Sequence, residues 1–562
     1  MKNIVAVGLI ATLLVSPIVF AQEAPVFGET LEIRVTNVEV IVSDKSGKPV
    51  HGLTKDDFEI YENGVRQELT NFAEIGESVP AGNLTTAPGQ ATAEPVNRDF
   101  RRRLISVFID NASLNTGNRA SVLPQLRQFL ASNVRPGDGI AIYSWGSSLN
   151  VQLEPTSDPA AIAAAVDKLA SHTTLATSWR QEFRSDLDLM IAAYKDRVPP
   201  EQPPISDAIS TAGAYASRAT TEMRQKTAAL KSVIASLRGI EGRKVLVMLT
   251  ESLSTNPAED TFQYIETIKQ EFANGLNFNP FAEARPFALQ GMAKEISDAA
   301  NGAGVTLYPI HAAGKWADSN MMDASESIEM RAGPSAGTIA SSTQTLFAVA
   351  EDTGGKAMAG SSNFKLAFDT ISNDLNVYYS LGYRTEGARQ DRLKNVEVKL
   401  KKKGYTVRTR KAIVEQTAAT EMNDMVAANL FQTRATNDLN IKAGIGAATP
   451  AGENLVHPLT ITIPTSTLTL MPDGADLVGK FSIFAAFLRS DGAVSSVGRQ
   501  TQQFRFPAAS LAKRKEVTVK LDVTADARVG AISLGVMDEA SSATGFALVK
   551  LPTPAEKTGS TE

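Results

Sequence analysis

The periodicity of hydrophobic residues changes along the chain. In the N-terminal part it is typical of β-strands. In "LEIRVTNVEVIVSD" apolar and polar residues alternate, as in half-buried strands, and Asn63-Gly64 marks a tight hairpin. We therefore predict a small β module over residues 29–76. Residues 77–99 contain Pro, Gly, Ala and Thr with few large apolar side chains, which is typical of a flexible linker. A fragment beginning near Phe100 is expected to fold without the module.

In residues 100–412 the period changes, because short apolar runs alternate with amphipathic helical stretches. The runs are "LISVFI", "GIAIYSW", "KVLVMLT", "GVTLYPI" and "VYYSLGY". This alternation predicts a doubly wound, mostly parallel sheet that is buried on both faces. Such sheets bind ligands at the carboxyl ends of their strands. The long segments after "KVLVMLT" and "GVTLYPI" predict a helical insertion and long loops over that face.

Beyond residue 412 the pattern predicts β structure again. Residues 413–445 read as a helical connector, residues 446–553 as an antiparallel β-sandwich, and residues 554–562 as a mobile tail. The fold class is therefore α/β and β multidomain. The doubly wound sheet would be flanked by the small β module and the β-sandwich.

The first residues favour export. Lys2 precedes an apolar stretch from Ile4 to Val15, and Ala21 ends a cleavage-type sequence, so residues 1–21 read as a signal peptide. No later stretch predicts a transmembrane segment. We expect a periplasmic or secreted protein without disulfides, because the chain has no cysteine. Its net charge of −5 and the lack of a long basic block argue against nucleic acid as a partner.

Six sequence motifs occur along the chain, and their order makes the set specific although no single motif is decisive. They are "VEVIVSDKSGKPVHGLTKDDFEIYENGVRQELTNF", "VFIDNASL", "RPGDGIAIYSWG", "AEDTGGKA", "NDLNVYYSLGYR" and "VEVKLKKKGYTVRTRK". Together they resemble the von Willebrand factor A-related domain proteins of the acidobacterial type, over roughly residues 30–412. The resemblance implies an exported A-type domain, a fold used mainly for binding proteins, often through bound Mg²⁺. It implies no known substrate.

The resemblance also implies where a divalent ion would bind. The A-type metal site uses Asp-x-Ser-x-Ser after the first strand, a Thr from a second loop and an Asp after the fourth strand. Asp110 holds the first position, but Ala112 and Leu114 replace both serines. Ser113 lies one place off the pattern, and Glu251 stands where the family has Asp.

A degenerate site for Mg²⁺ or Mn²⁺ is one interpretation of this loop. Its candidate ligands are Asp110, Ser113, Thr174 and Glu251, with Thr173 as the other choice for the threonine. The alternative is that no ion binds. Asp110 would then cap the following helix or accept N–H bonds from its own loop.

The sequence gives less support to an enzymatic function than to a protein-binding function. "GPSAG" matches the Gly-x-Ser-x-Gly nucleophile pattern at Ser335, but no apolar strand precedes it as the elbow requires. A serine hydrolase would need Ser335 near His311, which more simply reads as a structural histidine. No histidine pair has zinc-ligand spacing, and no phosphate-binding loop is present. We therefore predict that the protein is not an enzyme.

The predicted function is exported protein binding of the adhesion type, through the face at the carboxyl ends of the strands. Large apolar residues stand within the polar segments expected over that face, and an exposed apolar patch is the usual mark of an interaction site. The candidate partner-binding residues are Phe278, Phe281, Trp316 and Met321. The alternative is a structural envelope or assembly component without metal or catalysis.

Overall fold

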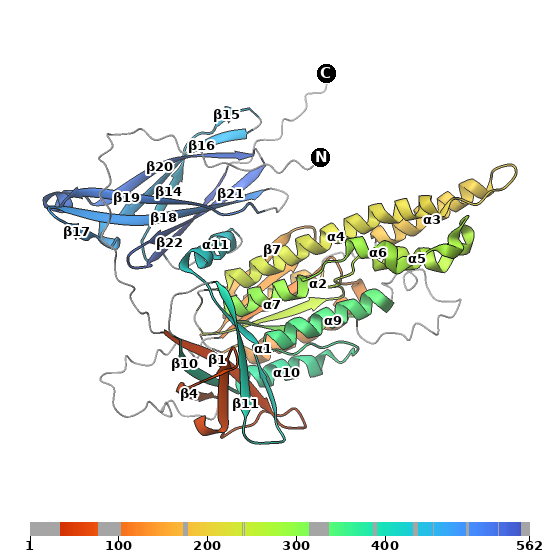
Figure 1. The fold of residues 1–562 in the computed structure, drawn as a ribbon, viewed down its shortest axis with the longest axis horizontal. Coiled ribbons are helices and arrows are strands. Elements are labelled where there is room, and N and C mark those ends of the chain that lie inside the picture. Colours follow the sequence, from red (N-terminus) through yellow and green to blue (C-terminus); the bar gives the residue numbers. More distant parts are fainter. Residues whose placement is uncertain are drawn as a thin grey trace. The chain divides into compact units, whose positions relative to one another are not determined.

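Two compact units make up the chain in the computed structural model (Figure 1). The first unit comprises Glu32–Ala388 and Arg392–Glu415, and the second is formed mainly by the chain from Gln416 onward. The structure describes residues 34–76, 103–135, 137–171, 178–238, 240, 242–313, 336–385, 391–430, 437–452, 454–489, 494–526 and 528–551. The signal peptide, the linker and the mobile tail predicted from the sequence lie outside these ranges.

A five-stranded sheet lies at the centre of the first unit, in the order β7-β6-β5-β8-β9. The four strands β6, β5, β8 and β9 form three parallel pairs, and β7 pairs antiparallel with β6. Every residue of β5 is buried, which a strand covered on both faces requires. The strands are β5 (Arg103–Asp110), β6 (Gly139–Trp145), β7 (Leu149–Thr156), β8 (Arg243–Thr250) and β9 (Val305–His311).

Helices cover both faces of this sheet. Successive side chains of β5 alternate between two buried clusters: Ile105 and Val107 belong to one, Leu104 and Phe108 to the other. The first cluster includes side chains of α1 (Thr116–Asn133), α2 (Pro159–Ala170) and α10 (Phe364–Asn376). The second includes side chains of α4 (Ile205–Ser236), α7 (Met292–Ala303) and α9 (Ala336–Asp352).

Two further sheets join the first residues of the unit to its last ones. One has the order β12-β1-β10-β4, and the other β13-β11-β2-β3. Their strands are β1 (Arg34–Ser43), β2 (Phe58–Glu62), β3 (Val65–Gln67), β4 (Leu69–Ile75), β10 (Tyr378–Thr385), β11 (Arg392–Leu400), β12 (Thr406–Thr409) and β13 (Ala412–Glu415), with a 3-10 turn, η1, at Lys55–Asp57. The Asn63-Gly64 hairpin is confirmed, because Glu62 pairs with Val65 and both turn residues have positive φ.

This pairing corrects two expectations from the sequence. "VYYSLGY" does not join the parallel sheet; it forms β10, which lies antiparallel between β1 and β4. Residues 29–76 are therefore not a separate module, because β1 and β2 pair with strands from 378–409. Both sets share one core, in which Val38 and Val40 meet Tyr379. A buried strand has the same local pattern in either kind of sheet, so its partner is not encoded locally.

A group of helices rises from the carboxyl ends of the parallel strands and has a core of its own. We call residues 178–219 and 258–287 the helical arm (Figure 1). Since α4 leads directly into β8, it runs antiparallel to the strands. Its second half covers the sheet and its first half extends beyond the strands. The other elements of the arm are α3 (Ser178–Lys195), α5 (Glu259–Ile268), η3 (Lys269–Glu271), η4 (Gly275–Asn277), α6 (Pro280–Ala284) and η5 (Arg285–Phe287).

The second unit consists of two antiparallel sheets and one helix. One sheet has the order β14-β16-β15 with β20 beside β16, and the other has β17-β18-β21-β22 with β19 beside β18. Apolar residues of both sheets form one shared core. The strands are β14 (Lys442–Ile445), β15 (Thr449–Ala451), β16 (Asn454–Pro464), β17 (Met471–Asp473), β18 (Asp476–Arg489), β19 (Gly498–Pro507), β20 (Glu516–Asp526), β21 (Val529–Asp538) and β22 (Thr544–Lys550), with 3-10 turns at Thr465–Thr467 (η6) and Ala508–Lys513 (η7).

The helix of this unit, α11 (Ala418–Asn429), lies in the stretch predicted to be a connector, but it packs on the second sheet. Its Met422 and Val426 lie against β21 at Gly535, where an added Cβ would be 2.5 Å from Val426 Cγ2. The glycine thus permits a close approach between helix and strand. Throughout the described ranges, no helix is both long and apolar enough to cross a membrane.

Candidate functional site

Asp110 is the last residue of β5, and its side chain is fully buried. β5 pairs in parallel with β6 on one side and with β8 on the other. The strands that follow β5 in sequence therefore lie first on one side of it and then on the other. The crevice at the carboxyl end of such a strand is the usual ligand position in parallel sheets. The predicted position of Asp110 at the end of a strand is therefore confirmed, and the structure adds that this strand end is the point at which the strand order switches sides.

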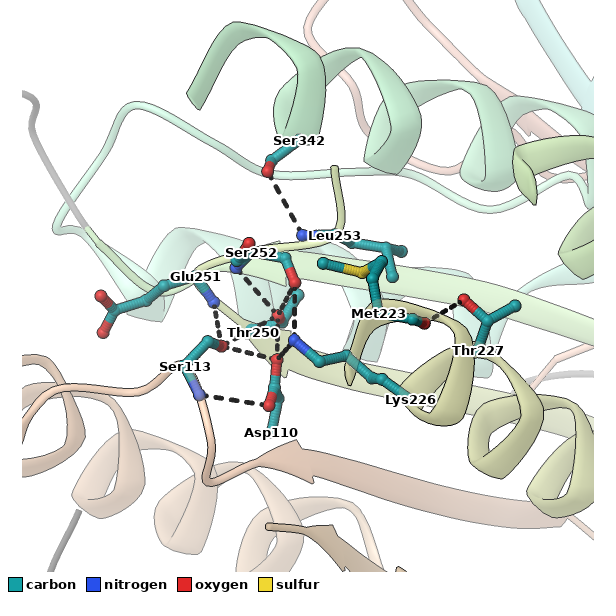
Figure 2. Close-up of polar contacts among 10 residues, drawn as sticks. All are labelled: Asp110, Ser113, Met223, Lys226, Thr227, Thr250, Glu251, Ser252, Leu253 and Ser342. Carbon is teal, nitrogen blue, oxygen red and sulfur yellow. Dashed lines mark hydrogen bonds and ion pairs between the residues drawn. The ribbon is translucent and has the colours of Figure 1, made fainter. Parts of the chain in front are cut away.

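The Asp110 carboxylate is surrounded by hydrogen-bond donors (Figure 2). Its Oδ2 accepts from Ser113 Oγ at 2.6 Å and from Thr250 Oγ1 at 2.6 Å. Its Oδ1 accepts from the backbone N–H of Ser113 at 3.2 Å. Each hydroxyl also accepts a backbone N–H: Glu251 N donates to Ser113 Oγ at 3.0 Å, and Ser252 N to Thr250 Oγ1 at 3.1 Å. The β5 and β8 loops are thus tied together through Asp110.

A lysine neutralises this carboxylate. Lys226 Nζ lies 2.7 Å from Asp110 Oδ2, and the side chains are 4% and 0% exposed. The ammonium also donates to the Ser252 carbonyl at 2.9 Å. A buried charge is tolerated when it is paired and hydrogen-bonded, as both partners are here.

Glu251 faces away from Asp110 and performs a different task. Its carboxylate accepts from Asn115 N and Asn118 Nδ2, both at 2.9 Å, and from Asn115 Nδ2 at 3.2 Å. Burial raises the pKa of Glu251, and the hydrogen bonds from Asn118 and Asn115 oppose that rise. Asn115 is the N-cap of α1, so Glu251 braces the start of that helix. Figure 2 shows its carboxylate pointing out of the Asp110 cluster.

The structure brings Asp110 and Ser113 together, with Glu251 beside them, while Thr174 lies outside the described residues. Two members of the cluster, Thr250 and Lys226, were missed from the sequence. Thr250 is simply the last residue of a core strand. Lys226 did carry a signal, because it is in helical phase with the buried Met223 and Leu230. A lysine on an apolar helix face implies a buried partner.

The residues present do not fit the divalent ion that A-type domains bind. Mg²⁺ needs oxygen ligands with free lone pairs in near-octahedral geometry. The two serine positions carry Ala112 and Leu114, and Leu114 is fully buried in the core. An ammonium already occupies the space next to Asp110 Oδ2. Among the residues that the structure describes, no group of three or more His, Cys, Asp or Glu side chains is placed to hold a metal.

His311 ends β9 beside Thr250, and its side chain is 1% exposed. Burial lowers its pKa to about 4, and a hydrogen bond with the Glu251 backbone partly opposes this. A neutral, buried imidazole agrees with a structural role. Ser335, its proposed partner in a hydrolase, lies outside the described residues.

The buried His311 predicts acid sensitivity. Its pKa is depressed in the folded state, so between pH 6.5 and 4 the unfolded chain binds more protons and stability falls as pH falls. We expect the wild type to lose up to about 3 kcal/mol relative to His311→Gln between pH 7 and 4. Denaturant unfolding of both proteins across this range measures the difference. A constant difference would show that the imidazole does not titrate as its burial implies.

The candidate partner-binding residues divide into three cases. Phe278 is half-buried and packs on the core of the helical arm. Phe281 is 66% exposed, and Leu276, in the same short segment, is 84% exposed. Trp316 and Met321 lie outside the described residues. Phe278 therefore serves the arm's own packing, whereas Phe281 and Leu276 are two of the arm's apolar side chains that are open to a partner, besides Leu189 and Val198.

No family profile and no curated protein matches the sequence. Several solved structures are similar to it. An aerotolerance-related membrane protein from Bacteroides fragilis matches at 12% identity, covering 49% of this chain and 98% of its own, with a TM-score of 0.24. The conserved hypothetical protein BatB from Bacteroides thetaiotaomicron matches at 12% identity, covering 49% and 96%, with a TM-score of 0.22. A von Willebrand factor type A protein from Catenulispora acidiphila matches at 8% identity, covering 88% and 72%, with a TM-score of 0.22. Because these sequence identities and TM-scores are low, we draw no conclusion about function from the similar structures.

Proposed function

We propose that the chain is an exported, non-enzymatic protein-binding module of the von Willebrand factor A-related type. The observation that carries the proposal is the helical arm at the carboxyl ends of the parallel strands, which presents Leu276 and Phe281 to solvent. Exposed large apolar side chains on a well-packed support are typical anchors of protein interfaces. The arm has its own core, so these side chains are held by folded helices.

The finer assignments belong to the same proposal. The five-stranded sheet with helices on both faces is a doubly wound sheet in this reading, and the two sheets of the second unit form a β-sandwich. Signal cleavage after Ala21 and a periplasmic or secreted location complete it. The competing function is a structural envelope or assembly component that binds nothing through the arm.

Substitution of both exposed anchors tests the binding surface. We expect Leu276→Ala/Phe281→Ala to reduce partner retention by about thirtyfold, as loss of about 2 kcal/mol at a hot spot implies. The melting temperature should stay nearly unchanged, because both side chains are exposed. Retention is measured with immobilised protein and envelope extract from the source cells, followed by quantification of each retained band.

Leu366→Ala is the matched control, because Leu366 is 62% exposed on α10, outside the arm. It should retain the partner as the wild type does. Equal retention by the double variant and the wild type would remove the arm as the binding surface. Absence of any specific band with the wild type would favour the structural envelope component.

A further inference from the structure

We propose that the ammonium of Lys226 takes the place of the divalent cation of A-type domains and fixes the helical arm in a permanently set, metal-independent position. Lys226 is a positioning residue in this scheme. The inference concerns the strand-end cluster in its own right, and only its link to partner capture rests on the proposed function.

The lone pairs of the two hydroxyl groups in the cluster are already used within the protein. Ser113 and Thr250 each donate a hydroxyl hydrogen to Asp110 Oδ2 and accept a backbone N–H. Their oxygens are therefore engaged within the protein and are not held open for an ion. In an ion site the hydroxyl oxygens and the carboxylate would point lone pairs at a common centre. Here the carboxylate oxygen is itself the common centre, and the ammonium is one of its three donors.

The charges of the cluster are already balanced without a metal ion. Asp110 and Lys226 balance each other in a setting where both are almost inaccessible to water. A divalent ion entering beside the ammonium would place three positive charges against one carboxylate at low dielectric, which is strongly unfavourable. Metal binding would require Lys226 to leave, and the Ser252 carbonyl would then lose its donor as well.

Lys226 lies on α4 just beyond the part of this helix that belongs to the arm. Two of the connections between the arm and the sheet are α4 and the segment between β8 and α5. The ammonium of Lys226 bonds to Ser252 in that segment and to Asp110 at the end of β5. One side chain therefore ties two of the arm's connections to the same strand end. In a metal-dependent domain, an exchangeable ion would link these segments at the strand end. Here the ammonium of Lys226, a cation that is covalently part of the chain, links them.

Thermal unfolding with and without divalent ions tests the proposal. The wild type should show the same melting temperature in EDTA, in 5 mM Mg²⁺ and in 5 mM Mn²⁺, concentrations of about the millimolar level at which a metal-stabilised fold would respond. Lys226→Ala should melt lower in EDTA and regain about 5 °C or more in Mg²⁺ or Mn²⁺, since Asp110 is left unpaired in a polar cavity. Asp110→Ala/Lys226→Ala should show no metal response.

Two results would overturn the proposal. One is a metal-dependent rise in the wild type, because the ammonium would then not fill the ion's place. The other is a Lys226→Ala protein that remains insensitive to both ions. Should Lys226→Ala fail to fold in EDTA, Lys226→Gln, which keeps a donor on a side chain one bond shorter and removes the charge, replaces it under the same criteria.

Partner retention separates this inference from the proposed function. Wild-type retention should be equal in EDTA and in Mg²⁺, and Lys226→Ala should lose retention in EDTA and recover it in Mg²⁺. Loss of wild-type retention in EDTA overturns the metal independence of the arm. Absence of retention under every condition rejects the binding function, while the melting experiment still decides the role of Lys226.

Discussion

A chain that begins at Arg103, and therefore lacks β1 to β4, is expected not to fold its first unit cooperatively. β1 is an interior strand, paired with β10 on one side and with β12 on the other. Its removal, together with that of β2 and β4, takes six buried apolar side chains from one core: Val38, Val40, Val42, Phe58, Ile60 and Leu69. At about 1.5–3 kcal/mol each, their loss totals roughly 10 kcal/mol or more, comparable to the whole stability of a typical domain.

Circular dichroism and denaturant unfolding of the truncated chain measure this effect. Adding residues 34–76 back as a separate polypeptide should restore a cooperative transition, because the missing strands find the exposed edges of β10 and β11. A chain that ends at Glu415 is the control, since it loses only the second unit. A truncated chain that unfolds like this control would mean that residues 34–75 add little to the fold.

This expectation reverses the one drawn from the sequence, in which a fragment beginning near Phe100 folds without the preceding residues. The apolar runs did identify β5, β6, β8 and β9 correctly, because a strand buried on both faces needs a continuous apolar stretch. "VYYSLGY" has the same character, yet it pairs antiparallel with β1. Local alternation and burial do not encode which distant strand lies alongside, so the N-terminal strands were assigned to a module of their own.

The part of the candidate site that lies at the carboxyl ends of the strands could be predicted from the sequence. Asp110 and Ser113 lie at the end of β5, and Thr250 and Glu251 lie at the end of the adjacent β8, so parallel pairing alone brings them together. The role of Glu251 could not be read from its position, because the direction of its side chain depends on donors from Asn115 and Asn118. Lys226 comes from α4, a helix that packs on one face of the sheet, and only its helical phase indicated burial.

The second large effect concerns the buried pair itself. Asp110→Ala should lower the free energy of unfolding by about 3–5 kcal/mol, because it leaves the Lys226 ammonium buried without its counter-charge. Lys226→Met should be destabilising for the same reason, since it leaves the carboxylate uncompensated. In Asp110→Ala/Lys226→Met neither charge remains, so the double variant should be clearly more stable than the sum of the two losses implies.

A double-mutant cycle from urea unfolding gives the coupling between the two residues. The exposed pair Lys365–Asp369 is the matched control: its charged atoms are 2.6 Å apart, but its side chains are 68% and 53% exposed. Asp369→Ala should leave stability nearly unchanged, because solvent screens an exposed ion pair. The comparison separates burial from distance, since the two pairs have similar separations and differ in access to water. Additive losses at Asp110 and Lys226 would mean that the two groups do not depend on each other, and that hydroxyl donors alone hold the carboxylate at the end of β5.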